Sequence, residues 1–534
     1  MRKLIIGIFI LYCFFPSTRA EAAALGWHEL RTDDDGRIQP WLEEGGGAPC
    51  DGTVRRLWGF WNGLGACPNG VAYGLQHRIW RPEHDTRGIG AGQISMGLSS
   101  WALLWAYGGD PAVLDALKTT ADYVLRHGLS PPGSRWPNLP YPCNTEAHTG
   151  IFDGDAKAGR GFLQPDKAAD FGAELLAVHG ITGASRHLEA AQAIADTLAR
   201  MAGPGDGERS PWPFRVHAGT GEVKDGYTAN WTGALRLFDG LIRLRQGDGA
   251  LYAKAREAAT VWLKNHPMKT GRWGPYFDED SGGSDAQINA ESLAWYILES
   301  PEWDREWKKG ARTILDRSLA AFGSTAWARY GVTALKGRAA DRFPGANHTA
   351  RHAAVELLYS ERTGDGTRRE ASIRQLIWAT YMVAKDGRSG SPMVSGSSSS
   401  LEGSSPPSLE IRLDEGYGDL LRHFLRAMAA APELAPADQD HILRTSTAVR
   451  SIRCTTESIT YATAGPPSRE RLRVRGTPGK VTAGGAVLPR LQTPEALEKE
   501  EGWSFTPLGK EGGILDVRHD AAADVDVRAQ GPGN

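Results

Sequence analysis

The stretch that decides the fold runs from residue 90 to residue 126 and reads GAGQISMGLSSWALLWAYGGDPAVLDALKTTADYVLR. Its first half, Gly90 to Tyr107, is rich in small and apolar residues, which predicts a helix buried on several sides. The turn Gly108-Gly109-Asp110 ends in a good N-cap residue, and proline suits the first turn of the helix that follows. That second helix, Pro111 to Arg126, carries charges between its apolar residues, as a surface helix does. The stretch therefore predicts a hairpin of one buried and one half-exposed helix.

The same unit recurs along the chain. Four further hairpins are expected, at Pro165 to Arg200, Tyr227 to Asn265, Ser284 to Leu319 and Asn347 to Val383, and a sixth first helix at Gly416 to Ala430. Repeats of this kind bury a continuous core only by stacking on their neighbours. We therefore expect the buried helices to form an inner ring and the amphipathic helices to form an outer one.

The pattern changes after Pro436. Polar and apolar residues alternate at Ser458–Ala462, Arg471–Arg475, Ile514–Arg518 and Asp524–Arg528, and such alternation between turn residues is typical of short half-buried strands. The predicted fold class is thus mainly α, an (α/α) toroid of about six helical hairpins followed by a small C-terminal antiparallel β-domain.

These patterns divide the chain into four parts. They are a signal peptide over 1–20, a loop-rich N-terminal segment over 21–84, the toroid over 85–440 and the β-domain over 441–534. Within the toroid, the Ser/Gly/Pro-rich stretch Ser389 to Ser408 indicates either a mobile loop that acts as a lid or a plain disordered insertion.

The first twenty residues have the layout of a secretory signal peptide. Arg2 and Lys3 precede an apolar run from Leu4 to Phe15, and small residues follow up to Ala20. The run is shorter than the roughly 20 apolar residues that span a bilayer. The sequence therefore predicts a secreted or periplasmic protein with no membrane contact after cleavage, with a retained anchor as the alternative.

Charge and cysteine content narrow the function further. The chain has 61 basic and 63 acidic residues, which argues against a general nucleic-acid binder. Cys50, Cys67, Cys143 and Cys454 remain after cleavage; Cys50 with Cys67 is the best disulfide pair, although four cysteines allow three pairings. None has the spacing of a zinc site. We expect a monomer without metal or cofactor.

Serial helical hairpins, aromatic-rich loops, a signal peptide and a trailing β-domain together resemble the six-hairpin glycosidase-like (α/α)6-toroid superfamily, over roughly residues 85–440. The resemblance implies carbohydrate chemistry, because the superfamily contains glycoside hydrolases, polysaccharide lyases and related enzymes. It also implies an active cleft at one end of the ring, near the starts of the inner helices.

Polar segments stand at all six of these starts. They are His84-Asp85-Thr86-Arg87, Asp166-Lys167-Ala168-Ala169-Asp170, Asp225-Gly226-Tyr227-Thr228-Ala229-Asn230-Trp231, Asp285-Ala286-Gln287-Ile288-Asn289-Ala290-Glu291, Asn347-His348-Thr349-Ala350-Arg351-His352 and Asp414-Glu415-Gly416-Tyr417-Gly418-Asp419. Helix capping explains any single acid among them. It does not require the Tyr, Trp, His and Arg residues beside the acids, which a sugar site would use.

Glycoside hydrolysis needs two carboxyl groups, which stand roughly 6.5–9.5 Å apart in an inverting enzyme. We therefore expect the two acids to come from different hairpins. The predicted catalytic pair is Asp225 and Glu415, with Asp414 and Asp170 in reserve. The residues expected to bind the sugar beside them are Tyr227, Asn230, Trp231 and Tyr417.

Two other functions compete with hydrolysis. A polysaccharide lyase would cleave a uronate-containing glycan by β-elimination, with His348 as a catalytic base. The substrate-binding residues expected there are Asn347, Arg351, His352, Trp327 and Arg329. The alternatives for this cluster are a purely structural role and, for the two histidines one turn apart, a metal site. The third possible function is that of a non-catalytic glycan-binding surface protein, in which the catalytic candidates would be dispensable.

Overall fold

The computed structural model describes residues 30–41, 48–65, 91–146, 149–277, 280, 283–394, 409–413, 417–509 and 512–530. The expected signal peptide lies outside these residues. Five helical hairpins follow one another along the chain. They are α3 (Ala91–Gly108) with α4 (Pro111–His127), α5 (Pro165–Thr182) with α6 (Ser185–Met201), α7 (Thr232–Leu244) with α8 (Gly249–Asn265), α10 (Gln287–Glu299) with α11 (Trp307–Phe322), and α12 (Ala346–Thr363) with α13 (Arg369–Tyr381).

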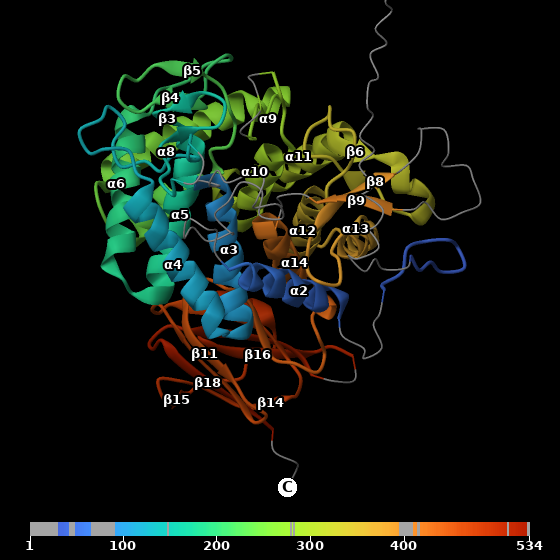
Figure 1. Ribbon diagram of the computed structural model, residues 1–534. Coiled ribbons are helices and arrows are strands. Elements are labelled where there is room, and N and C mark those ends of the chain that lie inside the picture. The colour runs from blue at the N-terminus through green and yellow to red at the C-terminus, as the bar shows by residue number, and fades with distance from the viewer. Residues whose placement is uncertain are drawn as a thin grey trace, which may run out of the picture.

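A sixth hairpin closes the ring from both ends of the helical region. Helix α14 (Tyr417–Ala430) packs between α12 and α3 as the last inner helix, and α2 (Pro49–Gly63) packs against α14 and α13 as its outer partner. Figure 1 shows α2 lying beside α14, although more than 350 residues separate them in the chain. The segment expected to be loop-rich therefore contributes a helix that completes the toroid.

Local sequence explains where the hairpins turn. The side chain of Asp110 accepts a hydrogen bond from the backbone N–H of Ala112 at 2.9 Å, so it caps α4 as expected. Gly183, which ends α5, has φ = 71°, a left-handed conformation that glycine adopts without a steric penalty. Helix α7 begins only at Thr232, five residues later than the hairpin that starts at Tyr227 in the sequence pattern.

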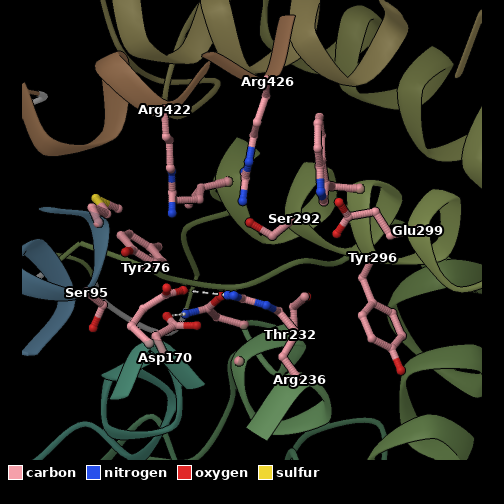
Figure 2. Close-up of a pocket in the computed structure, with 16 residues that line it drawn as sticks. Ser95, Asp170, Thr232, Arg236, Tyr276, Ser292, Tyr296, Glu299, Arg422 and Arg426 are labelled. Carbon is pink, nitrogen blue, oxygen red and sulfur yellow. Dashed lines mark hydrogen bonds and ion pairs between the residues drawn. The ribbon is translucent and has the colours of Figure 1, made fainter. Parts of the chain in front are cut away.

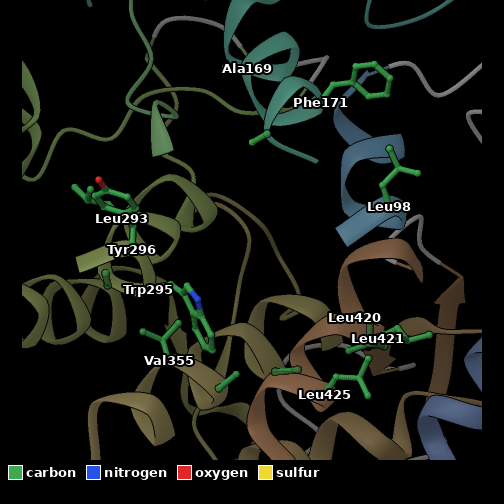
Figure 3. Packing of buried hydrophobic residues seen from close by; sticks show 14 of the residues in the cluster. Leu98, Ala169, Phe171, Leu293, Trp295, Tyr296, Val355, Leu420, Leu421 and Leu425 are labelled. Carbon is green, nitrogen blue, oxygen red and sulfur yellow. The ribbon is translucent and has the colours of Figure 1, made fainter. Parts of the chain in front are cut away.

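The inner helices are buried on most of their surface because they contact both ring neighbours and their outer partners. Leu98 of α3, Phe171 of α5, Leu293 of α10, Val355 of α12 and Leu420 of α14 belong to one hydrophobic core that runs around the ring. Figure 3 shows these residues projecting from different inner helices. Packing of this kind makes each hairpin dependent on its neighbours for stability.

The C-terminal region is an antiparallel β-sandwich. One sheet has the strand order β10-β13-β17-β16, and the other has the order β11-β12-β18-β14-β15. The bounds are β10 His441–Thr445, β11 Val449–Cys454, β12 Ser458–Thr463, β13 Ser468–Val474, β14 Pro478–Ala483, β15 Ala486–Val487, β16 Gly502–Pro507, β17 Gly513–His519 and β18 Asp524–Ala529. All four strands expected from the sequence are present as β12, β13, β17 and β18, around a core of their own.

The sandwich covers the end of the ring where the inner helices finish. Strands β10 and β11 contact α3, and the indole N–H of Trp105 in α3 donates to the backbone oxygen of Val449 at 2.8 Å. Figure 1 shows the sandwich on one side of the ring and the short strands β3 (Phe162–Leu163), β4 (Arg215–His217) and β5 (Val223–Asp225) on the other. The starts of the inner helices therefore face away from the β-domain.

Other short elements connect the helices. They are β1 (Gly154–Asp155), β2 (Gly159–Arg160), α9 (Pro267–Thr270), η2 (Pro301–Trp303), β6 (Gly323–Ser324), η3 (Thr325–Tyr330), β7 (Ala334–Leu335) and η4 (Pro432–Leu434), with η5 (Pro494–Glu498) in the sandwich. The stretch expected to be a loop from Ser389 to Ser408 begins with strand β8 (Gly390–Val394), which pairs antiparallel with β9 (Leu409–Leu413). Residues 395–408 lie outside the described residues.

The sequence also led us to expect a disulfide and no membrane contact. No disulfide joins two cysteines within the described residues, and burial together with the charge of Asp51 raises the pKa of the Cys50 thiol to about 12. Cys67 lies outside the described residues. Among the helices that are described, none has both the length and the apolar character needed to cross a bilayer.

Candidate functional site

A cavity lies on the axis of the ring, between α3, α5, α7, α10 and α14 (Figure 2). It runs from the first turns of the inner helices, where Asp170, Asn230 and Thr232 line it, to Glu299 in the last turn of α10. Its wall is unusually charged for the interior of a helical ring. Two of the residues predicted from the sequence, Asp170 and Asn230, therefore meet at one cavity.

Asp170 of α5 is the most perturbed acid on this wall. Its half-buried carboxyl accepts a hydrogen bond from Nδ2 of Asn230 at 3.0 Å. Burial, and then the nearby negative charge of Asp166, raise the pKa of Asp170 to about 7. A Cβ on Gly233 would lie only 2.2 Å from the Asp170 carboxyl, so glycine at that position of α7 leaves room for it.

The neighbouring acid, Asp166, is fully buried and has partners of its own. Nζ of Lys167 lies 2.6 Å from its carboxylate, and Nδ2 of Asn230 donates to the same oxygen at 3.1 Å. Lys167 also places its ammonium group 3.7 Å from the centre of the Tyr276 ring. Asp166 therefore forms a buried ion pair with Lys167, and its negative charge favours a proton on Asp170.

A second cluster surrounds Asp419 in the first turn of α14. Its carboxylate accepts hydrogen bonds from Nη2 of Arg351 and Nη2 of Arg422, and lies 3.0 Å from Nε2 of His423. Burial alone would raise the pKa of Asp419, but the guanidinium groups of Arg351 and Arg422 hold it well below its ordinary value. Tyr276 lies between the two clusters: burial and then the charges of Asp170 and Asp419 raise its pKa.

His348 is half-buried at the start of α12. Nη1 of Arg351 lies 3.1 Å from its Nδ1, and because a guanidinium can only donate, Nδ1 is the acceptor and Nε2 carries the hydrogen. Burial, and then the charge of Arg351, lower the pKa of His348 to about 3. The imidazole is therefore neutral across the working pH range of most enzymes. Asn347 beside it points its Nδ2 toward Asp419 at 3.5 Å.

Asp225 lies apart from the cavity lining, on strand β5. Its carboxylate accepts a hydrogen bond from Nη1 of Arg215 at 2.9 Å, and Arg215 also pairs with the buried Asp155 at 3.0 Å. The same guanidinium donates to the backbone oxygen of Asp280, whose carboxylate pairs with Arg338 at 2.7 Å. Asp225 is thus the outer member of an ion-pair network that pins the loops around the inner-helix starts.

Of the five other predicted residues, four pack inside the protein or at its edge, and Arg329 is exposed. Trp231 is fully buried against Trp212, and Tyr227 donates from its hydroxyl to the backbone oxygen of Arg272. Trp327 packs against Trp378 of α13, whereas the exposed Arg329 bonds to the Tyr330 hydroxyl at 2.6 Å. His352 is buried, with Nδ1 2.7 Å from Glu291. These positions do not line the cavity, so a substrate-binding role for them stays a prediction that the geometry does not favour.

Arg351 is likewise enclosed, because Asp419, Gln287 and His348 surround its guanidinium. Asp414 and Glu415 lie outside the described residues. Tyr417 begins α14, but its side chain is also outside them. Among the acids Asp278, Glu279 and Asp280, the structure describes only Asp280, and in the described part of the chain no group of three or more His, Cys, Asp or Glu could hold a metal ion.

Sequence reasoning did not select Tyr276, Asp419, Arg422 or Arg426, all of which lie at or beside the cavity. Asp419 belongs to the sixth polar segment, so that segment contained the signal. Arg422 and Arg426 stand one turn apart on a helix expected to be buried, and two arginines on one face of a buried helix indicate a functional or structural role. Tyr276 lies in a loop where no periodicity marks it.

Six helical hairpins closed into a ring, with charged groups where the inner helices begin, make up an (α/α)6 toroid, so the expected fold is confirmed. No protein-family model and no curated protein sequence matches the chain.

Solved structures with this fold include a sugar epimerase from a ruminal bacterium, with a TM-score of 0.52 and 12% identity over 71% of this chain and 98% of that one. They also include the cellobiose 2-epimerase of Bacillus thermoamylovorans B4167, with a TM-score of 0.52 and 13% identity over 71% and 98%. The cellobiose 2-epimerase of Spirochaeta thermophila DSM 6192 matches with a TM-score of 0.50 and 14% identity over 72% and 97%.

Proposed function

We propose that this chain is a carbohydrate-active enzyme, and specifically a glycoside hydrolase that uses Asp170 as its proton donor. The observation that carries the proposal is a carboxyl group on the axial cavity whose pKa is raised to about 7. Such a group keeps its proton near neutral pH and can transfer it to the oxygen of a leaving sugar. An ordinary aspartate, with a pKa of about 3.9, would already be ionised.

Hydrolysis also requires a carboxylate that activates water or attacks the sugar. We propose Glu415 for this role, with Asp414 in reserve, because both directly precede α14, whose Arg422 lines the same cavity as Asp170. Asp225 is the weaker candidate because Arg215 already engages its carboxylate.

The test is the Asp170→Asn variant, which keeps the shape of the side chain but cannot donate an acidic proton. Neutral and uronic polysaccharides would first be screened by reducing-end release and by ultraviolet absorbance. On the best substrate we expect the variant to lose about 10²–10⁴-fold in kcat while substrate affinity stays within a few-fold. Asp115→Asn, an exposed position on α4, is the matched control. Unchanged turnover in Asp170→Asn would remove this residue from catalysis.

A second candidate function is β-elimination of a uronate. The observation that favours it is His348, a half-buried imidazole whose pKa is lowered to about 3, so that it is neutral at the pH of the reaction. Its Nδ1 would act as the base in place of accepting from Arg351. A lyase would release a product with an unsaturated sugar that absorbs in the ultraviolet, and His348→Ala would abolish that absorbance. Reducing ends without absorbance would leave only the hydrolase.

We also propose that the enzyme acts outside the cytoplasm on a poly- or oligosaccharide, as a monomer. The signal-peptide pattern of residues 1–20 supports the location. Amino-terminal sequencing of the exported protein should begin shortly after Ala20, and an intact Met1 on the mature protein would contradict export by cleavage. Light scattering of the mature protein tests the oligomeric state.

A further inference from the structure

The axial cavity is lined by arginines as well as by the carboxyl groups of Asp170, Glu174 and Glu299. Three arginines line it, one from α7 and two from α14. Arg236 pairs with Glu174 at 2.7 Å, and Arg422 pairs with Asp419. Arg426 differs from both: among the described residues, no carboxylate forms an ion pair with it and no oxygen accepts a hydrogen bond from it.

What Arg426 does contact is an aromatic ring. Its guanidinium lies 4.5 Å from the centre of the Trp295 ring, on the same cavity wall. Burial, and then the charge of Arg422, lower the pKa of Arg426 to about 9, so it remains cationic at neutral pH. The charges of Glu299 and Glu174 favour its cationic form, but neither carboxylate forms an ion pair with it. A half-buried cation without a paired partner is costly.

Two neighbouring donors also lack an acceptor. Nε of Arg422 and the indole N–H of Trp295 are buried and make no hydrogen bond in the described structure. Figure 2 shows Arg422 and Arg426 extending side by side from α14 toward the wall that carries Asp170 and Arg236. Buried donors normally find a partner, so these two N–H groups together with the guanidinium of Arg426 offer donors to an anion.

We propose that Arg426, with Arg422 beside it, binds the carboxylate of an acidic sugar, so that the substrate of this enzyme is a uronate-containing glycan. The inference rests on the proposed function, because it places the substrate between this anion site and the Asp170 proton donor. Arginine suits a carboxylate because its planar guanidinium offers two parallel N–H donors to the two oxygens.

The size of the cavity agrees with a carboxylate rather than a whole sugar. It has a free volume of about 50 Å³, whereas a single water needs roughly 10–15 Å³ of such space. A carboxylate with one or two waters fits, and a pyranose ring does not. The sugar ring would therefore lie outside this space, beyond Asp170 and Asn230 at the inner-helix starts, with its carboxylate directed inward.

The test compares binding of matched probes to the full-length mature protein. D-glucuronate, D-galacturonate and D-mannuronate are each paired with the neutral sugar that has a hydroxymethyl group in place of the carboxylate, and inorganic sulfate is a separate probe. We expect calorimetry to show at least one uronate binding ten or more times tighter than its neutral partner. Arg426→Met should abolish that preference, and Arg426→Lys should restore part of it.

Arg243→Met, an exposed position in the last turn of α7, is the matched control and should bind like the wild type. The melting temperature of unliganded Arg426→Met should equal or exceed that of the wild type, because the substitution removes a half-buried cation that no described carboxylate pairs with directly. A large fall would mean that the residue is structural and would overturn the inference.

Equal binding of uronates and neutral sugars would also overturn it. Binding of sulfate without any uronate preference would show a site for a free inorganic anion, which contradicts a substrate contact. Because binding is measured without turnover, the two proposals fail separately. If uronates bind preferentially but Asp170→Asn keeps full activity, only the proposed role of Asp170 in hydrolysis is contradicted. If Asp170→Asn loses activity but uronates show no binding preference, only the anion site is contradicted.

Discussion

Two aspartates show how neighbours decide what a carboxyl group can do. The carboxylate of Asp225 lies 2.9 Å from the guanidinium of Arg215, with which it forms an ion pair. Asp170 receives only an amide hydrogen bond, and the nearby lysine, Lys167, bonds to Asp166 instead. Burial and a like charge then favour the protonated form of Asp170. The acid with the raised pKa is the better proton donor, although both begin as acids near a helix start.

The raised pKa of Asp170 predicts a pH dependence with a definite sign. Turnover should fall as pH rises through about 7, because the proton donor is then ionised. A carboxyl whose pKa is raised by folding also stabilises the fold at low pH, and that contribution is lost as pH rises through the folded value. We therefore expect Asp170→Asn to melt higher than the wild type at pH 8.5 and nearly level with it below pH 4.

Scanning calorimetry at several pH values measures this difference directly, with Asp115→Asn as the control that should track the wild type throughout. A difference in melting temperature that does not change with pH would contradict the raised pKa. The predicted fall in kcat with rising pH is a separate test, because kcat is measured on folded protein only.

The network around Arg215 predicts a different outcome for Asp225. Arg215 is fully buried between Asp155 and Asp225, so Arg215→Met should destabilise the protein by about 3–5 kcal/mol by leaving a buried carboxylate without its partner. Asp225→Asn should cost less, because its side chain is 21% exposed and Asp155 remains to pair the arginine.

Urea unfolding of the two single variants and the double variant gives the coupling between these residues. We expect Asp225→Asn to keep turnover within a few-fold of the wild type. If it instead folds normally and loses 10³-fold in turnover, Asp225 is catalytic, as the sequence alone predicts.

At the scale of elements, the sequence predicted the hairpins well because each carries its own local signals. The cap at Asp110 and the left-handed glycine at Gly183 mark where helices start and stop, and apolar spacing distinguishes inner from outer helices. Helix α2 was missed because its partner, α14, follows it by more than 350 residues. Its sequence, PCDGTVRRLWGFWNG, carries no turn that links it to a hairpin.

Helix α2 nonetheless contributes to the main core, which predicts the effect of shortening one of its side chains. Leu57 is 2% exposed and belongs to the hydrophobic core of the ring. Leu57→Ala should lower the free energy of unfolding by about 2–5 kcal/mol. Asn62→Ala, an exposed position on the same helix, should change it by less than about 0.5 kcal/mol. Denaturant unfolding checks both, and equal small effects would mean that α2 does not close the ring.

The candidate site was only partly predictable, for a reason that also belongs to this scale. Sequence places Asp170, Asn230 and Trp231 near inner-helix starts, but the direction of each side chain depends on how the helices rotate against one another. Packing turned Trp231 into the core and Asp170 toward the axis. The Arg422 and Arg426 pair was overlooked because charges on a helix usually face water.

At the scale of the whole molecule, the β-sandwich packs at the end of the ring opposite the inner-helix starts, where Asp170 and Asn230 line the cavity. The sandwich packs beneath the ends of α3 and α14, so it braces the inner helices without covering their starts. Its polar link to α12 is Glu361, which pairs with Arg444 of β10 at 2.6 Å and with Arg471 of β13. Arg471 in turn pairs with Asp516 of β17 at 2.9 Å. The contact therefore reaches three strands of one sheet.

This link predicts how strongly the two parts unfold together. Arg444 and Arg471 hold the pKa of Glu361 below its ordinary 4.5 despite burial. Its contribution is therefore present above about pH 4.5 and is lost as pH falls through the lower folded value. Glu361→Gln should cost about 1.5–3 kcal/mol at pH 7, and the cost should shrink as pH falls below 4.5.

Calorimetry should then show the single transition of the wild type splitting into two, because the substitution weakens the interface but neither core. Glu433→Gln, which removes an exposed ion pair with Arg369 elsewhere on the ring, should leave one transition. A variant that still unfolds in one step, with an unchanged melting temperature at pH 7, would show that apolar packing of the sandwich core on α3 couples the two parts without help from this charge. In that case the β-domain would brace the ring through residues such as Ala106 rather than through Glu361.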